Sequence, residues 1–286
     1  MDTVTDIPKL PPRKTESHKG NFGSVCIVGG KVGMSGAPAL AAMSALKSGS
    51  GLVRVAIPSG ILNIVASFDP CYITAPLTEN ENGEISETAV GTVVNLCKDS
   101  DIVAVGPGMG AGRGSRRLVN NLLKTDGLRI VADADALNCL AKETGWHKRK
   151  KASVIITPHP GELKRLWKSV FRDPMPSERK TQAAKFASET GCTVVLKGAS
   201  TVVSDSQKVY VNTTGNPGMA TGGSGDVLTG IIAALAGQGL SDFDASQLGV
   251  YIHGLSSDIA AEKYGQISLT PREIIKNLPK AFMRFV

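Results

Sequence analysis

The sequence predicts an α/β protein in which a mainly parallel central sheet is flanked by helices. Short β-branched runs alternate with segments of helical period along the chain. Most predicted strands are apolar throughout rather than alternating, which is typical of strands covered by helices on both faces. With 42% hydrophobic residues among 286, the chain can fill a complete core, which excludes wholesale disorder.

The predicted elements follow one another from the amino end to the carboxyl end. We expect strands at 24–28, 52–57, 72–75, 101–105, 129–132, 153–157, 193–197, 201–204 and 208–213. We expect helices at 37–47, 86–97, 115–124, 136–143, 162–167, 178–190, 226–237, 245–263 and 271–285. The last two strands are separated by a few polar residues, which indicates a hairpin.

The domain organisation is predicted to be simple. Residues 1–17 are polar and proline-rich, which indicates a flexible amino-terminal arm. No linker, composition shift or internal repeat divides the remainder, so residues 18–286 are expected to form one domain.

The charge and the cysteines limit the partners and the cellular compartment that the sequence allows. The formal net charge is +7, but the densest basic run, 147–151, is short and is interpreted as a solvated loop, so no nucleic-acid partner is expected. The five scattered cysteines lack a C-x-x-C spacing and indicate reduced thiols. The first residues do not resemble a signal peptide, and the run 227–236 is too short to span a bilayer. These features predict a cytoplasmic protein without a membrane partner.

Glycine-rich turns follow four predicted strands and precede predicted helices. They lie at 29–36, 106–110, 157–162 and 221–226. Because the carboxyl ends of parallel strands share one edge of a sheet, these loops are expected to converge on one ligand site.

The loop at 221–226 carries the clearest chemistry. Three glycines at a helix start let an anion approach unpaired backbone amides, which the helix dipole also favours. Asp226 either complements the dipole of the first helical turn or acts as a general base beside the bound anion.

Other motifs leave alternatives open. The run 106–111 matches a G-x-G-x-x-A dinucleotide fingerprint, although the acids that follow it come late. His159 binds a ligand or satisfies a turn, and Glu162 starts a helix or organises hydrated Mg²⁺. Residues 197–201 cradle a nucleotide or form a hairpin corner. No P-loop, zinc-protease spacing or nucleophile elbow is present in the sequence.

An ordered set of motifs resembles the NAD(P)H-hydrate dehydratase family of the ribokinase-like superfamily, over roughly residues 18–284. The motifs are KGNFG (19–23), IVGG (27–30), GMSGAP (33–38), GLVRV (51–55), GPG (106–108), DADALN (133–138), TPHPGE (157–162) and GNPGMATGGSGDVLTG (215–230). The resemblance implies a ribokinase-like three-layer fold and a repair enzyme. Such an enzyme dehydrates the S epimer of NAD(P)H hydrate with ADP, releasing AMP and phosphate.

The resemblance also implies roles for particular residues. The catalytic base is Asp226, and the substrate contacts are Ala37 or a neighbour on its helix, Gly108, His159 and Asp226. The adenine nucleotide lies on Lys197, Gly198, Ala199, Ser200, Thr201 and Gly225. The anion hole consists of Gly223, Ser224 and Gly225, with the amide of Asp226 beside it. Glu162 places Mg²⁺ through water.

Several implications concern partners. The family implies ADP, or ATP, as co-substrate, a separate epimerase for the R epimer, and a homo-oligomer such as a tetramer. One residue departs from the family pattern: Lys31 replaces the usual serine of the first glycine-rich loop. Two alternatives remain at this point, a kinase of a small vitamin-precursor alcohol and a nucleotide-binding sensor without turnover.

Overall fold

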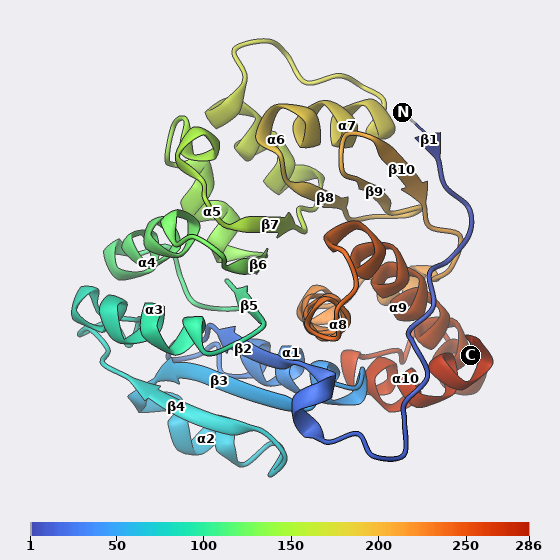
Figure 1. Cartoon of the computed structure of the whole chain (residues 1–286), viewed down its shortest axis with the longest axis horizontal. Helices are drawn as coiled ribbons and strands as arrows, with labels where there is room; N and C mark the ends of the chain where they lie inside the picture. The colour runs from blue at the N-terminus through green and yellow to red at the C-terminus, as the bar shows by residue number, and fades with distance from the viewer. Residues whose placement is uncertain (1, 286) are drawn as a thin grey trace.

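A computed structural model describes residues 2–285 and centres on one ten-stranded sheet (Figure 1). The strands are β1 (Asp2–Thr3), β2 (Ser24–Val28), β3 (Leu52–Pro58), β4 (Ile73–Leu77), β5 (Ile102–Val105), β6 (Arg129–Ala132), β7 (Ser153–Ile156), β8 (Thr193–Leu196), β9 (Val202–Ser204) and β10 (Lys208–Val211). The α-helices are α1 (Gly36–Lys47), α2 (Leu62–Ala66), α3 (Val90–Lys98), α4 (Arg113–Lys124), α5 (Asp135–Ala141), α6 (Pro160–Val170), α7 (Arg179–Thr190), α8 (Ser224–Gly237), α9 (Asp242–Tyr264) and α10 (Pro271–Phe285).

The sheet is mainly parallel, as predicted. Its strand order is β1-β10-β9-β8-β7-β6-β5-β2-β3-β4. Neighbouring strands from β8 through to β4 pair in parallel, whereas β9 pairs antiparallel with both β8 and β10. The expected hairpin near residue 205 is therefore confirmed.

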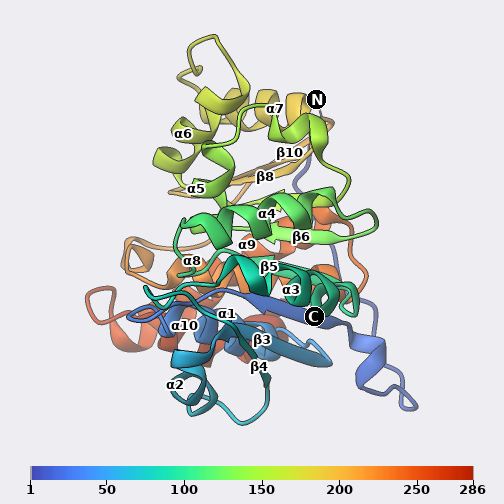
Figure 2. The ribbon, with the colours of Figure 1, turned by 90° about the vertical axis from the view of Figure 1, so that its left-hand side faces the viewer.

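Helices cover both faces of the sheet and make three layers (Figure 2). In β2 the side chains of Val25 and Ile27 enter the core shared with α1 and α8. Cys26 and Val28, between and beyond them, enter the core on the other face with α4 to α7. This alternation explains why the strand is apolar at every position.

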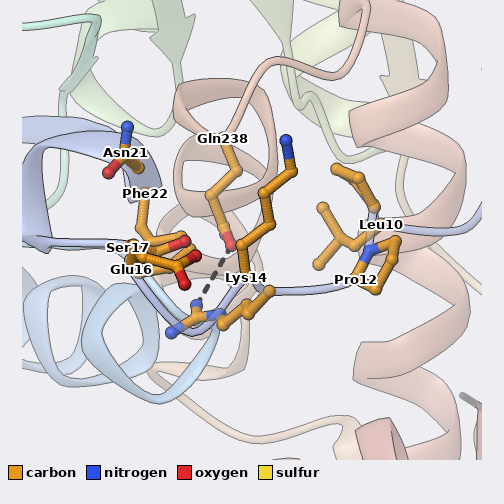
Figure 3. A pocket seen from close by; sticks show the side chains of 10 residues that line it. Leu10, Pro12, Lys14, Glu16, Ser17, Asn21, Phe22 and Gln238 are labelled. Atoms are coloured by element: carbon orange, nitrogen blue, oxygen red, sulfur yellow. Dashed lines mark hydrogen bonds between the residues drawn. The ribbon is translucent and has the colours of Figure 1, made fainter.

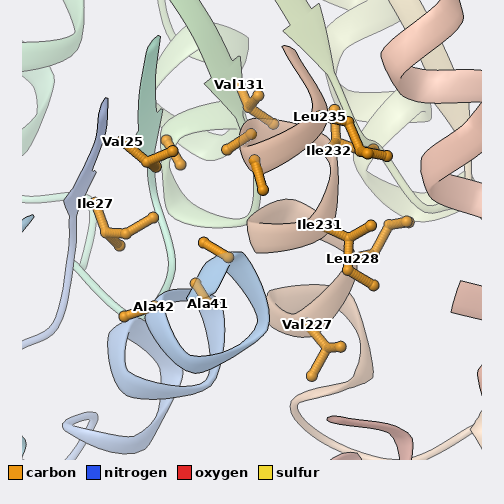
Figure 4. Packing of buried hydrophobic residues seen from close by; sticks show 14 of the residues in the cluster. Val25, Ile27, Ala41, Ala42, Val131, Val227, Leu228, Ile231, Ile232 and Leu235 are labelled. Carbon is orange, nitrogen blue, oxygen red and sulfur yellow. The ribbon is translucent and has the colours of Figure 1, made fainter. Parts of the chain in front are cut away.

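Helices α1 and α8 pack closely on one face of the sheet (Figure 4). A Cβ atom at Gly230 of α8 would lie 2.0 Å from the carbonyl oxygen of Ala41 in α1. Glycine is thus required there for the backbones to approach. This contact fixes α8, and with it the glycine-rich segment at its amino end, against the sheet.

The amino-terminal segment follows a defined course. Strand β1 pairs with β10, and the Gln247 side chain donates to the carbonyl of Asp6. Arg13 lies over the Phe22 ring and donates to the carbonyl of Gly49 at 2.7 Å. A cavity of about 430 Å³ lies beneath this segment (Figure 3). The division into a flexible arm at 1–17 and a domain at 18–286 stays a prediction.

Two elements were not predicted, β1 and α2. Both are too short for their hydrophobic period to be distinguished from a loop. Helix α8 begins two residues earlier than expected, at Ser224. Between residues 2 and 285, no helix combines the length and apolar character required to cross a bilayer.

Candidate active site

The glycine-rich loops meet at one edge of the sheet, as the parallel topology requires. The amide of Gly30 donates to the carbonyl of Pro107 at 2.8 Å, which joins the first two loops. On the other side, the amide of Lys197 donates to the carbonyl of Pro158 at 2.8 Å. The first loop is therefore held by the second, and the third by the segment that follows β8.

Helix α8 presents a glycine-rich amino end to this edge. Gly223 adopts a φ of 93°, a left-handed conformation that favours glycine. The amide of Ser224 donates to the carbonyl of Thr221, whereas those of Gly225 and Asp226 have no partner within residues 2–285. Two unpaired amides with the positive end of the helix dipole form a site for an anion.

A buried network lies under this helix start. The carboxylate of Asp133, which is 1% exposed, accepts from the Lys197 ammonium at 2.7 Å. Its other oxygen accepts from the Thr229 hydroxyl at 2.8 Å. A Cβ atom at Gly225 would lie 3.3 Å from the Lys197 nitrogen. The ammonium is therefore in contact with the first turn of α8.

The carboxyl of Asp226 lies in this electrostatic environment. Burial and, to a smaller extent, the negative charge of Asp133 raise its pKa, and the Lys197 ammonium opposes both, so that the pKa is raised to about 7. A carboxyl with a pKa near neutrality is well suited to accept a proton, because it is stronger as a base than an ordinary aspartate. Both expected functions of Asp226 remain compatible with its place in the first helical turn.

His159 and Glu162 cap helix α6. The Nδ1 atom of His159 accepts from the amides of Gly161 and Glu162, and Glu162 accepts from the amide of His159 at 2.8 Å. These bonds cap the start of α6, so both residues have the structural function that the sequence allowed. The sequence also allowed a ligand-binding function for each. The His159 side chain stays half exposed, although its Nε2 atom lies 3.6 Å from a Glu162 oxygen, so the residue can still contact a ligand.

Glu162 is the carboxylate available for a divalent cation. Burial raises its pKa, while Lys197 lowers it. One of its oxygens accepts from His159, and both oxygens of Asp133 are already paired. No group of three metal-ligating side chains occurs within residues 2–285. This donor set fits a hydrated Mg²⁺ held largely by phosphates, and it does not fit an all-protein cage.

Gly108 and Ala37 lie side by side. A Cβ atom at Gly108 would lie 3.1 Å from the Cβ atom of Ala37. Gly108 also adopts a φ of 62°, so two constraints require glycine here. The structure thus places these two expected substrate contacts next to each other.

Lys31 does not point freely to solvent. Its ammonium pairs with the Glu84 carboxylate at 3.2 Å. The pair joins the first glycine-rich loop to the turn before α3. This departure from the family pattern therefore has a structural function in the chain.

The expected nucleotide segment 197–201 joins β8 to β9. Gly198, Ala199 and Ser200 are exposed, whereas the Lys197 side chain turns inward to Asp133. The Lys197 side chain is therefore directed into the protein, whereas residues 198–200 lie at the surface.

Asp133, Asp135 and Thr229 received no site function from sequence reasoning. Asp135 accepts from the amide of Gly110 at 2.9 Å and so holds the second loop. Ala134 between the two acids has a φ of 49°, a strained conformation for a residue with a side chain. The signal was available, since two acids directly follow a buried strand.

The fold and this edge define a class, the ribokinase-like α/β proteins, with a carboxylate at a glycine-rich helix start. Residues 25–280 match the family described as NAD(P)H-hydrate dehydratase, and the chain belongs to that family. The resemblance and the ribokinase-like three-layer fold predicted from the sequence are confirmed.

Relatives with assigned names agree with this placement. The ADP-dependent (S)-NAD(P)H-hydrate dehydratase of Neisseria meningitidis is 38% identical over 88% of this chain and 82% of its own length. The bifunctional NAD(P)H-hydrate repair enzyme Nnr of Moorella thermoacetica is 43% identical over 95% of this chain. The chain spans 51% of that relative's length.

Solved structures share the fold. An ADP/ATP-dependent NAD(P)H-hydrate dehydratase from Bacillus subtilis, co-crystallized with ATP/Mg²⁺, has a TM-score of 0.80 and 28% identity. The alignment covers 97% of this chain and 95% of that one. A ribokinase-like protein from Enterococcus faecalis has a TM-score of 0.82 at 24% identity, covering 97% and 92%, which supports the fold alone.

Proposed function

We propose that the protein dehydrates the S epimer of NAD(P)H hydrate in an ADP-dependent reaction and releases NAD(P)H, AMP and phosphate. The observation that carries the proposal is Asp226, a carboxyl of raised pKa, beside two unpaired amides at the start of α8. A base and an anion site at one helix start are the parts that phosphoryl transfer requires. Family membership supports the same reaction.

The chemistry follows from this arrangement. The Asp226 carboxylate takes the proton of the hydroxyl on the nicotinamide ring, and the freed oxygen attacks the terminal phosphorus of the nucleotide. The amides at the start of α8 stabilise the charge on the transferring group, where one preorganised donor contributes about 3–4 kcal/mol. Phosphate then leaves the ring carbon while the adjacent carbon loses a proton, which restores the ring double bond.

The proposed ligand positions occupy two sides of Asp226. The nucleotide lies on Gly198 to Thr201 and against Gly225, with its transferred phosphate at Gly223, Ser224 and Gly225. The hydrated ring lies toward Ala37, Gly108 and His159. Glu162 orients a hydrated Mg²⁺, which supplies charge neutralisation at the phosphates when it is bound.

An assay on purified S hydrate tests the proposal. With ADP and Mg²⁺, absorbance at the reduced-nicotinamide band is expected to return, with one AMP released for each NAD(P)H formed. Parallel reactions with ATP determine the nucleotide preference. Absence of recovery with both nucleotides contradicts the proposal, and a stable phosphorylated product from a small alcohol supports a vitamin-precursor kinase instead. Tight nucleotide binding without phosphate release supports the sensor.

Three wider proposals accompany this function. A separate epimerase supplies the S epimer, and the double function named for the bifunctional relatives supports that link. The protein acts as a homo-oligomer, proposed as a tetramer, which size-exclusion chromatography with light scattering tests. It acts in the cytoplasm, which agrees with four buried thiols and no disulfide among the described cysteines.

A further inference from the structure

Arg179, at the first position of α7, contacts the segment that follows β8. Its guanidinium donates to the carbonyls of Leu196 at 2.8 Å and Lys197 at 3.1 Å. A further bond joins it to the carbonyl of Ala199. One side chain therefore holds the last carbonyl of β8 and two carbonyls of the segment on which the nucleotide is proposed to lie.

The remaining carbonyl of this segment is also occupied. The Thr201 hydroxyl donates to the carbonyl of Gly198 at 3.0 Å. The four successive carbonyls from 196 to 199 thus accept bonds from within the protein. The backbone amides of Gly198, Ala199 and Ser200, by contrast, have no hydrogen-bond partner within residues 2–285, and Thr201 closes the turn at 199–200.

The backbone conformation agrees with this division of donors and acceptors. Gly198 has a φ of 143° and Ser200 a φ of 52°, both outside the range that most side chains prefer. A Cβ atom at Gly198 would lie 3.1 Å from the Arg179 guanidinium. Successive amides in such an irregular turn form a concave donor surface for anions.

Partial burial of the Arg179 guanidinium costs free energy, and the bonds to the three carbonyls offset that cost. Burial lowers its pKa, and its Nε atom is buried without a hydrogen-bond partner within the described chain. An arginine is nevertheless charged at every pH that the protein experiences. A partly buried cation of this kind is retained where its bonds hold a conformation in place.

We propose that Arg179 is a positioning residue for the adenine nucleotide. Its guanidinium binds the carbonyls of Leu196, Lys197 and Ala199. The amides of Gly198, Ala199 and Ser200 are thereby left to donate to the nucleotide. This inference rests on the proposed function, because it assumes that the segment binds nucleotide. It assigns Arg179 to nucleotide affinity and leaves the chemical step to Asp226.

Two variants and a matched control test the inference. Arg179→Met removes the three bonds, and Arg179→Lys keeps the charge but presents a single ammonium that does not span three carbonyls. Lys180→Met removes a charge from the adjacent exposed position. Calorimetric titration with ADP, and with ATP, gives the dissociation constants, and steady-state assays give KM and kcat.

Both Arg179 variants are expected to bind nucleotide about 10–100-fold more weakly, the effect of losing several hydrogen bonds from a charged donor. Their kcat at saturating nucleotide is expected to stay within about threefold of the unmodified chain, since they do not touch the reacting atoms. Lys180→Met is expected to change affinity less than twofold.

The outcomes separate this inference from the proposed function. Unchanged nucleotide affinity in a folded Arg179 variant overturns the inference, and a fall in its melting temperature then makes Arg179 a scaffold residue. If Arg179→Met does not fold, Arg179→Lys decides by the same criterion. If the unmodified chain binds neither ADP nor ATP, the proposed function fails and the inference falls with it. If the unmodified chain binds and turns over, the function stands whatever the variants show.

Discussion

Asp226 combines two requirements that oppose each other. At the start of α8 its charge interacts favourably with the helix dipole, yet burial and the Asp133 carboxylate disfavour the same charge. The result is a base that ionises near neutrality. Activity that depends on ionised Asp226 is therefore expected to rise as the pH passes through about 7.

The catalytic prediction concerns Asp226→Asn. The amide keeps the shape of the side chain but does not accept the proton, so kcat is expected to fall about 10²–10⁴-fold. Nucleotide affinity is expected to change little, because the backbone amides of α8 remain. Turnover and ADP titration on the same preparation measure the two effects. Near-normal turnover means that Asp226 serves the helix dipole alone.

The same variant makes a prediction about stability. The carboxyl has a pKa of about 7 in the folded chain and an ordinary value of 3.8, so its ionisation destabilises the fold. The unmodified chain therefore loses stability relative to Asp226→Asn as the pH rises from about 4 to 7. At pH 8 the variant is expected to be more stable by roughly 1–3 kcal/mol, and at pH 4 the two are expected to be equal. Chemical denaturation at both pH values checks this, and an equal difference at both contradicts it.

Single residues were predicted unevenly from the sequence. Asp226, Gly108 and His159 belong to local turns, so their neighbourhood in the chain indicates where they lie. Asp133 and Arg179 act on groups far away in the sequence: Asp133 reaches Thr229, 96 residues distant. The position of Asp133 after a buried strand was visible in the sequence, but the partners of Asp133 and Arg179 were not, because no local pattern contains such contacts.

At the scale of elements, the position of α8 depends on one hydroxyl. Thr229 lies one turn into the helix and donates to Asp133, which in turn holds Lys197. The network therefore joins α8 to the ends of β6 and β8. Its integrity decides where the unpaired amides of α8 lie relative to the segment at 198–201.

Thr229→Val removes that hydroxyl at nearly constant volume. Because it leaves a buried carboxylate oxygen without a donor, we expect the free energy of unfolding to fall by about 1–3 kcal/mol and kcat to fall more than nucleotide affinity. Thr229→Ser is the matched control, since it keeps the hydroxyl and is expected to stay close to the unmodified chain. Equal losses in both variants mean that the methyl group matters and the hydrogen bond does not.

Long elements were predicted well, and their ends less so. Helix α9 has a buried face over many turns, so its existence was clear from the sequence. The ends of α6 and α8 depend on Pro160 and Gly223, whose effect is decided by backbone geometry rather than by hydrophobic period. Both helices accordingly begin before the apolar pattern does.

At the scale of the whole molecule, the predicted layers and parallel sheet are those of the structure. The course of the amino-terminal segment was not predicted, because its few apolar residues are spaced irregularly. Val4, Ile7 and Leu10 nevertheless pack against the core shared by α8, α9 and α10. The composition of this segment is polar, but the contacts of these three side chains with the core fix its course.

Deleting residues 1–10 tests that contact. We expect the free energy of unfolding to fall by about 2–4 kcal/mol, from three partly buried apolar side chains and the β1 pairing. We expect kcat to be unchanged, since Arg13, which follows, contacts the carboxyl end of α8 at Gln238, opposite the proposed catalytic end. Lys9→Ala, at an exposed position, controls for the change in charge. Unchanged stability on deletion supports the flexible arm that the composition predicts.

The carboxylate of Asp133 has a consequence for how the chain folds. Its partners Lys197 and Thr229 lie 64 and 96 residues away, and neither bond forms until β6, β8 and α8 are in place together. Contacts of such sequence separation form slowly, after local helices and turns. A half-folded chain therefore holds most of its secondary structure and an unassembled active site. We therefore expect the proposed enzymatic activity to appear only once β6, β8 and α8 have assembled.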